Sequence, residues 1–327
     1  MALIESNNSG MALQPIAGAL EVSRAGLQPI DRQPAAVYLA GLAEGSRRSM
    51  RQALDVIAGL LSGGRETALS LDWAGLRYQH TQAIRSRLEE AYAPASANKI
   101  LSALRGALKE AWRLGLVESE DYTRAVDLKP VKGERLPKGR ALTAGELRAL
   151  FSQCQADSSV TARRDAALLA CLYGGGLRRS EAVSLDVSDY DAESGALKIR
   201  AGKGNKDRLV YLAEGGRRAL EAWLSLRGSG SGPLFLPVNK GGTIISRKLT
   251  GQAIVEALRE RALKAGVKGF SPHDMRRSFI SDLLDAGADI VTVQKLAGHS
   301  KPETTARYDR RGEETKRKAA ELLHVPF

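Results

Sequence analysis

The segment KPVKGERLPKGRAL, residues 129–142, constrains the fold most, because it divides the chain into two parts. It contains two prolines, two glycines and five Lys or Arg residues, and few apolar side chains that a core could bury. Proline and glycine at this density interrupt helices and strands. We therefore expect a basic linker over residues 129–142, with a separately folded domain on each side. The 327 residues are enough for two domains of ordinary size.

The part before the linker is predicted to be a helical domain over residues 31–128. One helix is expected over residues 78–92, and another opens with Pro94 at a first-turn position and closes at Gly115. Residues 1–30 are rich in Gly, Ser, Asn and Pro and contain the tetrapeptide LQPI twice. That composition favours a disordered arm.

The charge of the chain indicates a polyanionic partner. Lys and Arg number 49 and Asp and Glu number 37, which gives a net charge of +12. Aromatic residues make up only 5% of the chain, so duplex DNA is a better candidate than a single strand held by base stacking. An anionic membrane surface is the alternative. However, no apolar run is long enough to span a bilayer, and no basic helix has an opposite face rich in Trp and Phe.

Basic side chains that could contact DNA phosphates lie in two stretches. In the helix after Pro94, basic residues recur every fourth position on a face away from the apolar one, and the linker adds more positive charge. A solvated face is the plainer explanation of the helical stripe, but the net charge of the chain favours phosphate contact. The predicted DNA-binding residues are Arg105, Lys109, Arg113, Lys132, Arg135, Lys138 and Arg140.

The part after the linker, residues 143–311, is predicted to be mostly helical. Thr143 and Glu146 have the spacing of a capping box at its first helix. The alternating segments GALKIRA and DRLVYL flank GKGNK, so a β-hairpin with Lys203 at its tip is expected. Helical patterns then resume from residue 215 onwards. The predicted fold class is therefore mainly α with a small β-sheet.

Four segments after the linker carry the residues of a chemical site. They are YGGGLRRSEAVSL with Arg178, GKGNKDR with Lys203, SPHDMRRSF with His273 and Arg276, and LAGHSKPETTARYDR with His299 and Tyr308. In order, wording and spacing these segments resemble those of the tyrosine recombinase, or phage integrase, family, and the resemblance covers nearly all of residues 143–311. It implies a helical core-binding domain before the linker and a mixed, mostly α-helical catalytic domain after it.

The residues themselves fit the cleavage of a phosphodiester by a tyrosine. The guanidinium groups of Arg178 and Arg276 suit the non-bridging oxygens, because each can grip two oxygens and stays charged. His299 would add a hydrogen bond to the same phosphate. Tyr308 would be the nucleophile that forms a 3′-phosphotyrosyl bond, and Lys203 would protonate the leaving 5′-oxygen. Because that bond stores the energy of the cleaved ester, a 5′-hydroxyl could reverse the step without ATP.

His273 and Glu181 complete the predicted set. His273 begins a helix one turn before the second arginine, where it can move the proton of the tyrosine. Glu181 would support the first arginine by a charged hydrogen bond. The chain departs from the pattern of the family at Arg179 and Arg277, where a charge follows each of the two arginines.

Each of these residues has a plainer explanation when taken alone. A histidine at a helix start is commonly a cap or a surface group, and an arginine is commonly a surface charge. Their joint occurrence favours the catalytic explanation. No metal site is predicted, because four scattered histidines and two distant cysteines offer no ligand spacing. No nucleotide cofactor is implied, since YGGGLRR lacks the GxGxxG order and Lys203 is followed by Gly.

The resemblance also implies an assembly on DNA. The expected partner is double-stranded DNA with inverted half-sites, on which four protomers exchange strands through a Holliday junction. Residues 312–327 would form a tail helix that docks on the neighbouring protomer. Two alternatives stay open, a type IB topoisomerase and a DNA-binding regulator that keeps the fold, although His273 and the wording LAGHS favour the recombinase. Accessory proteins and the mobile element or locus served are open as well.

The expected compartment is the cytoplasm, in association with the nucleoid. Cys154 and Cys171 lie in apolar, helix-like stretches and indicate reduced core thiols. The N-terminal segment MALIESNNSG lacks both the positive charge and the apolar run of a signal peptide. No membrane association is expected.

Overall fold

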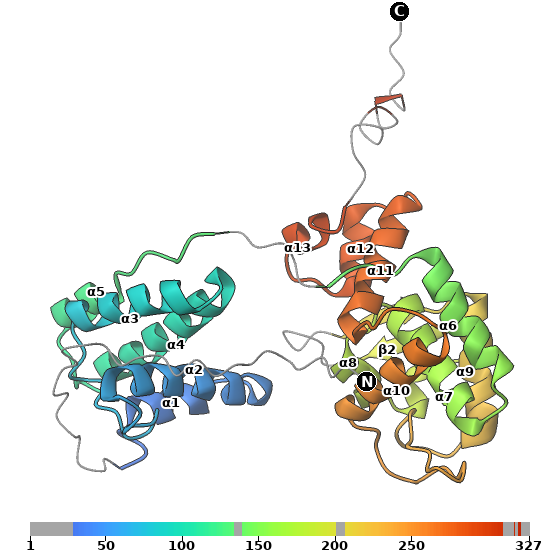
Figure 1. The fold of residues 1–327 in the computed structure, drawn as a ribbon, viewed down its shortest axis with the longest axis horizontal. Helices are drawn as coiled ribbons and strands as arrows, with labels where there is room; N and C mark the ends of the chain where they lie inside the picture. The colour runs from blue at the N-terminus through green and yellow to red at the C-terminus, as the bar shows by residue number, and fades with distance from the viewer. Residues whose placement is uncertain (1–28, 134–138, 201–206, 310–316, 318–319, 322–327) are drawn as a thin grey trace, which may run out of the picture. The chain divides into compact units, whose positions relative to one another are not determined.

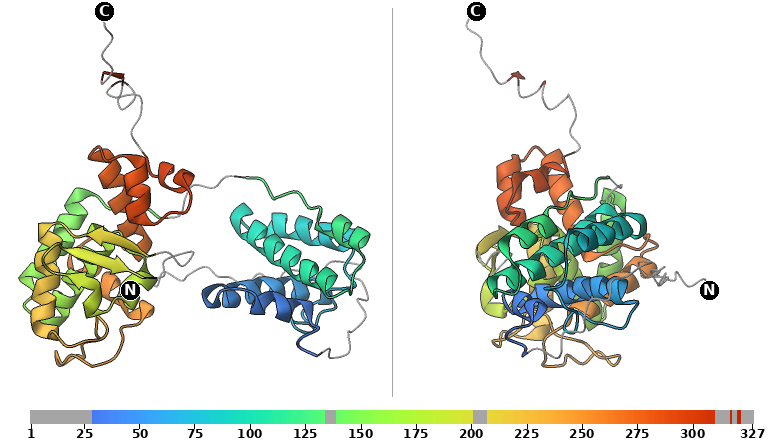
Figure 2. Two further views of the ribbon diagram at one scale, coloured as in Figure 1. Left: turned by 180° about the vertical axis from the view of Figure 1, so that it is seen from behind. Right: turned by 90° about the vertical axis from the view of Figure 1, so that its left-hand side faces the viewer.

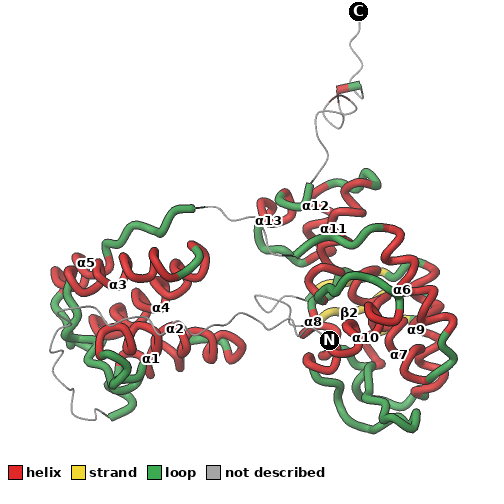
Figure 3. The backbone as a smooth tube through the Cα atoms, viewed as in Figure 1, coloured by secondary structure: helices red, strands yellow, loops and turns green. Residues whose placement is uncertain are grey.

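In the computed structural model the chain separates into two compact units, Met1–Leu136 and Pro137–Phe327 (Figure 1). The structure describes residues 29–133, 139–200, 207–309, 317 and 320–321. Most of the predicted arm and tail, together with Arg135, Lys138 and Lys203, therefore lies outside the described residues. The predicted fold class is confirmed: helices dominate both units, and the described strands all belong to the second one (Figure 3). No helix in the described part of the chain is both long and apolar enough to cross a membrane.

The first unit is built of helices around one apolar core. In chain order they are α1 (Pro34–Ala40), α2 (Glu44–Ser62), α3 (Tyr78–Ala91), α4 (Pro94–Arg113) and α5 (Ser119–Val126). Pro94 stands in the first turn of α4, where a backbone N–H would have no partner in the helix. Leu101 and Leu104 of this helix are fully buried, and burial of each such side chain contributes about 1.5–3 kcal/mol. Helix α1 packs so closely on α4 that a Cβ atom at Gly106 would lie 2.2 Å from the ring of Tyr38.

The second unit places helices around a small antiparallel sheet (Figure 2). Its helices are α6 (Ala144–Ala156), α7 (Val160–Leu169), α8 (Arg179–Ser184), α9 (Glu214–Arg227), α10 (Gly251–Lys264), α11 (Pro272–Asp285), α12 (Ile290–Ala297) and α13 (Pro302–Ala306). The strands are β1 (Tyr190–Asp191), β2 (Ala196–Ile199) and β3 (Arg208–Tyr211), in the spatial order β1-β2-β3. Strands β2 and β3 form the hairpin that the alternation predicts, with buried Leu197 opposite buried Val210.

A glycine-rich turn after α7 positions the segment that begins α8. Helix α7 widens into a π-helix over Ala170–Gly174, and the chain then turns through Gly176 at a φ of 58°. A Cβ atom at Gly176 would lie 2.3 Å from the ring of Phe279, so only glycine allows α11 to pack this closely on the turn. The turn therefore fixes the position of Arg178, which directly precedes α8.

Two apolar clusters hold the second unit together. The larger one contains Trp223 and Phe235 and surrounds the sheet. The smaller one joins α11 to α12 through side chains such as Leu284 and Val293, and Tyr308 packs against its edge. The packing of α11 against α12 thus fixes His273 and Arg276 on α11 relative to His299, which follows α12, and Tyr308 packs on the same cluster.

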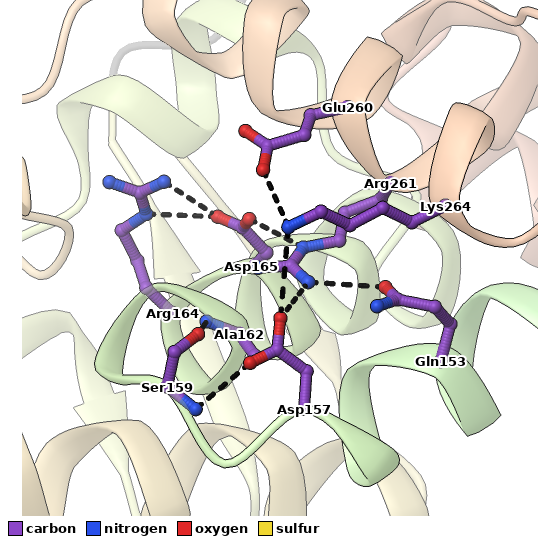
Figure 4. Close-up of polar contacts among 9 residues, drawn as sticks. All are labelled: Gln153, Asp157, Ser159, Ala162, Arg164, Asp165, Glu260, Arg261 and Lys264. Atoms are coloured by element: carbon purple, nitrogen blue, oxygen red, sulfur yellow. Dashed lines mark hydrogen bonds and ion pairs between the residues drawn. The ribbon is translucent and has the colours of Figure 1, made fainter. Parts of the chain in front are cut away.

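A buried network of ions ties α10 to α7 and to the end of α6 (Figure 4). Arg261 is fully buried, and its Nε donates to Asp165 at 2.8 Å while its Nη1 donates to Asp157 at 2.7 Å. Arg164 pairs with the other oxygen of Asp165 at 2.8 Å, and Lys264 reaches Asp157 at 3.9 Å. Acidic and basic groups therefore alternate through this network.

Candidate active site

The structure brings together predicted site residues from three of the four segments, all in the second unit. Arg178 caps the start of α8, and His273 and Arg276 lie on α11. His299 follows α12, and Tyr308 follows α13. Residues three apart lie on the same side of a helix, so His273 and Arg276 share one face of α11.

Arg178 is held by one carboxylate and one carbonyl. Its backbone N–H and its Nη1 donate to the two oxygens of Glu181, each at 2.7 Å. Its Nη2 donates to the carbonyl of Gly298 at 2.8 Å. Burial alone would raise the pKa of Glu181, but hydrogen bonds from Arg208 and Arg178 outweigh burial and hold it at about 2. Glu181 is therefore ionised at neutral pH.

Arg276 is almost completely buried and has neutral acceptors. It is 2% exposed, and its Nη1 donates to the carbonyl of Gly176 at 2.5 Å while its Nη2 donates to the carbonyl of Ala297. Burial and the nearby charge of Arg178 lower its pKa to about 9. The guanidinium is still charged at neutral pH, and the loss of hydration on burial contributes more to the lowered pKa than the repulsion from Arg178 does.

Arg208 is a member of this cluster that the sequence interpretation missed. From the start of β3, its Nη1 and Nη2 donate to the two oxygens of Glu181 at 2.9 and 2.7 Å, and its Nε donates to the carbonyl of Leu296 at 3.0 Å. Strand alternation could have found it, because Arg208 stands two residues before buried Val210 and shares its face. A charged residue on the inward face of a strand needs a buried partner.

Three arginines therefore converge on the end of α12. The successive carbonyls there accept hydrogen bonds in the pairs Leu296 with Arg208, Ala297 with Arg276, and Gly298 with Arg178. The last carbonyls of a helix have no partner within it and carry the negative end of its dipole, so they attract guanidinium groups. The chain turns through Gly298 at a φ of 62°, and His299 follows at once. The arginines and His299 are thus placed by one helix end.

Tyr308 lies beside the histidines of its own chain. Its hydroxyl is 3.5 Å from Nε2 of His273, and its ring stacks on that of His299 with the centroids 6.2 Å apart. The guanidinium carbon of Arg277 lies 5.4 Å from the centroid of the tyrosine ring, a cation–π arrangement. The hydroxyl group of Ser281 donates to the backbone carbonyl of Tyr308 at 3.3 Å. The contacts on the ring and on the backbone hold the side chain of Tyr308 beside His273 and His299.

Both histidines of the site are biased toward the neutral form. Burial, followed by the charges of Arg276 and Arg178, lowers the pKa of His299 to about 4, and its Nδ1 pairs with the hydroxyl of Thr305 at 2.9 Å. Burial and the charges of Arg277 and Arg276 also lower the pKa of His273. A neutral imidazole at His273 can accept a proton from a hydroxyl at neutral pH.

The residues predicted to contact DNA phosphates have varied surroundings. Arg105 donates to the carbonyls of Val126 and Leu128, at 3.4 and 2.5 Å, so its guanidinium is engaged within the first unit. Arg113 pairs with Glu110 at 2.9 Å, and Arg140 pairs with Glu146 at 2.6 Å. Lys109 and Lys132 are exposed to solvent.

Two other predictions concern Lys203 and metals. Lys203, which was predicted to lie at the tip of the hairpin, falls within residues 201–206, outside the described residues. Within the described ranges, no three His, Cys, Asp or Glu side chains gather in a way that could hold a metal ion.

Comparison with known proteins gives consistent matches in sequence. The model of the phage integrase family matches residues 140–314. The chain is 34% identical over 286 residues to tyrosine recombinase XerD of Pseudomonas aeruginosa, which covers 85% of this chain and 91% of that protein. It is 36% identical over 241 residues to tyrosine recombinase XerC of Azotobacter vinelandii, covering 72% of this chain and 76% of that protein.

The fold is also similar to that of solved structures. The integrase of transposon Tn1549 in complex with a circular intermediate DNA has a TM-score of 0.67 at 15% identity, covering 89% of this chain and 99% of that chain. A lambda integrase dimer bound to a COC′ core site has a TM-score of 0.62 at 16% identity, covering 86% and 95%. The XerH recombinase bound to a palindromic difH substrate has a TM-score of 0.59 at 20% identity, covering 92% and 91%.

Proposed function

Because this chain belongs to the phage integrase family and is a tyrosine-type enzyme that breaks and rejoins DNA at specific sites, we propose that Tyr308 is its nucleophile. The contact of the Tyr308 hydroxyl with Nε2 of His273, 3.5 Å away within one chain, carries this proposal. The positive charges of Arg276 and Arg178 lie close enough to lower the pKa of both His273 and His299. The tyrosine and these two arginines of one protomer would therefore act on the same phosphate.

The cleavage step follows from the chemistry of these groups. The phenol oxygen of Tyr308 attacks phosphorus, its proton passes to Nε2 of His273, and the bond from phosphorus to the 5′-oxygen breaks. Arg178 and Arg276 exchange carbonyl acceptors for the non-bridging oxygens, on which charge grows in the transition state. Lys203 supplies the proton that the leaving 5′-oxygen takes up. Attack by a 5′-hydroxyl on the 3′-phosphotyrosyl bond then reverses every one of these transfers, so rejoining needs no ATP.

A covalent adduct is the direct test. The protein first selects its own half-site from a pool of random-sequence duplexes. That half-site is then prepared with a nick near the cleavage position, so that the short strand released by cleavage diffuses away and cannot rejoin. Wild-type protein should become covalently attached to the DNA, and Tyr308→Phe should bind the same duplex without attachment. An adduct formed by Tyr308→Phe would move the nucleophile to another residue.

We propose further that the protein acts on double-stranded DNA with inverted half-sites, as a homotetramer. The net charge of +12 supports a polyanionic partner, and the XerD and XerC relatives support a recombinase. The tail, residues 312–327, would join neighbouring protomers, and Lys109 and Lys132 are exposed basic groups that would face phosphates. Truncation after Gly312 should abolish recombination and leave binding to a single half-site intact. Full recombination by the truncated protein would exclude this role of the tail.

A type IB topoisomerase would share the tyrosine chemistry but would relax DNA without a special site. The chain matches named recombinases at 34% identity over most of its length, which disfavours this alternative. Incubation with a supercoiled plasmid that lacks the selected site should therefore give no relaxation. Rapid relaxation of that plasmid would favour the topoisomerase.

A further inference from the structure

We propose that Arg208 is a positioning residue of the cleavage reaction, which fixes Arg178 and the end of α12 through its contacts with Glu181 and Leu296. This inference rests on the proposed function and deepens it. It concerns a side chain that lies outside the predicted catalytic set and is supplied by a strand rather than by a helix.

The first observation is that Glu181 is shared by two arginines. Its two oxygens accept from Nη1 and Nη2 of Arg208, while one of them also accepts from Nη1 of Arg178. Only 8% of Glu181 is exposed, and 11% of the side chain of Arg208. A parallel pair of hydrogen bonds fixes the plane of the carboxylate as well as its distance. Without Arg208, the carboxylate that orients Arg178 would lose the contact that fixes its rotation.

The second observation is that Arg208 also fixes the distance between β3 and α12. Its Nε donates to the carbonyl of Leu296 at 3.0 Å. A Cβ atom at Gly298 would lie 3.1 Å from each of Cδ, Nε and Nη1 of Arg208, so the side chain lies directly against the backbone there. His299 is the next residue, and the carbonyls on either side of Ala297 belong to this same turn. A shift of the turn would move His299 and the acceptors of Arg178 and Arg276 together.

The third observation is that Arg208 has no nitrogen left without an acceptor in the protein. Nε, Nη1 and Nη2 each donate to Leu296 or Glu181. A group that is engaged at every nitrogen acts on the phosphate through its neighbours rather than by direct contact. Arg276 differs in this respect, because Nη1 and Nη2 donate to the neutral carbonyls of Gly176 and Ala297.

The experiment compares Arg208→Gln and Arg208→Lys with a matched control on the same hairpin. Arg200 follows β2, and its Nε lies 2.6 Å from Oδ1 of buried Asp189, so Arg200→Gln removes the same charge and one ion pair to a different buried carboxylate, from a side chain that is 52% exposed. The probe is the nicked duplex carrying the half-site that the wild-type protein selects. The measured quantities are affinity for this duplex and the single-turnover rate of adduct formation.

We expect Arg208→Gln to slow adduct formation by about 10²-fold with unchanged affinity, because displacement of oriented groups by about 1 Å has effects of this size. Arg208→Lys should recover part of the rate, since an ammonium can pair with Glu181 but cannot bridge both of its oxygens. Arg200→Gln should react like wild type. Equal rates for Arg208→Gln, Arg208→Lys and Arg200→Gln would overturn the inference.

Two further measurements show through which groups Arg208 acts. In a double-mutant cycle with Glu181→Gln, the double variant should lose less rate than the product of the two single losses, because both substitutions remove the pair between Arg208 and Glu181. A duplex with sulfur in place of the bridging 5′-oxygen has a leaving group that needs no proton. It rescues variants that lack the general acid, but Arg208 is proposed to position other groups. The sulfur substitution should therefore not restore the rate of Arg208→Gln. Independent losses, or restoration by sulfur, would each overturn the proposed route. If the wild-type protein forms no adduct at all, the proposed function fails instead.

Discussion

Two buried arginines of the second unit, Arg261 and Arg276, have opposite electrostatic surroundings. Arg261 is fully buried between the carboxylates of Asp157 and Asp165 (Figure 4). Burial alone would lower its pKa, but the hydrogen bonds to these carboxylates outweigh burial and raise it. Arg276 is 2% exposed and donates to backbone carbonyls, and burial together with Arg178 lowers its pKa to about 9.

The difference separates Arg261, whose charge is paired with carboxylates of the fold, from Arg276, whose acceptors are neutral carbonyls. A buried charge is costly unless it is paired, and Arg261 has its pairing within the fold. Near Arg276 lies the carboxylate of Glu181, whose single negative charge is shared between Arg178 and Arg208. In the cleavage step that we propose, a DNA phosphate would add negative charge beside these arginines. Burial alone therefore does not show whether an arginine is structural or belongs to a functional site, and the charges around it are more informative.

The largest effect is expected at Arg276. Arg276→Gln should slow adduct formation on the nicked half-site by about 10³-fold, because two phosphate contacts are lost from the transition state. Arg276→Lys should also lose most activity, since an ammonium cannot grip two oxygens. Stability should change by less than about 1 kcal/mol, because the lost hydrogen bonds are offset by removal of an uncompensated buried cation. Thermal unfolding and single-turnover kinetics measure the two quantities, and a strongly destabilised Arg276→Gln would break the comparison.

The reverse result is expected at Arg261. Arg261→Gln should lower the free energy of unfolding by about 3–5 kcal/mol, because it leaves Asp157 and Asp165 without their shared cation. The folded fraction should form the DNA adduct at the wild-type rate when assayed well below the unfolding temperature. Denaturant unfolding gives the first quantity. A stable but inactive Arg261→Gln would show that this network belongs to the active site.

The sequence predicted one of these two regions and missed the other, for a physical reason. Arg178, His273 and Tyr308 stand in local patterns whose chemistry can be argued residue by residue. Arg261 is one of several basic residues on an ordinary amphipathic helix, and nothing local shows that it meets Asp165, 96 positions away in the chain. Arg208 was missed likewise, because its role depends on the contact of β3 with α12. The basic stripe on α4 was predicted to contact phosphates, and its spacing could not show that Arg105 turns onto the carbonyl of Leu128.

Acidification should affect the two regions at different pH values. Burial lowers the pKa of His299 from 6.5 to about 4, so between these values the unfolded chain takes up a proton that the folded chain does not. This histidine therefore makes the protein less stable as the pH falls from 6.5 to 4. The Arg261 network stays intact in this window, because the hydrogen bond from Arg261 lowers the pKa of Asp157 below 3.8.

His299→Gln should remove this component of the pH dependence. Unfolding temperatures at pH 7 and pH 5 measure it, and the drop between them should be smaller in the variant than in the wild type. His80 and His273 have lowered pKa values as well, so part of the drop should remain. An identical drop in both proteins would show that the site around His299 is more open to water than the structure indicates.

The smallest effect is expected at the solvent edge of the Arg261 network. Lys264 is 44% exposed and pairs with Glu260 at 2.7 Å and with Asp157 at 3.9 Å. Exposed pairs of this kind contribute about 0.3–0.5 kcal/mol, since water solvates both partners well. Lys264→Gln should therefore change the free energy of unfolding by no more than this, and added salt should remove the difference. A loss near that of Arg261→Gln would mean that the network needs all its cations together, and that burial of Arg261 is not what makes it structural.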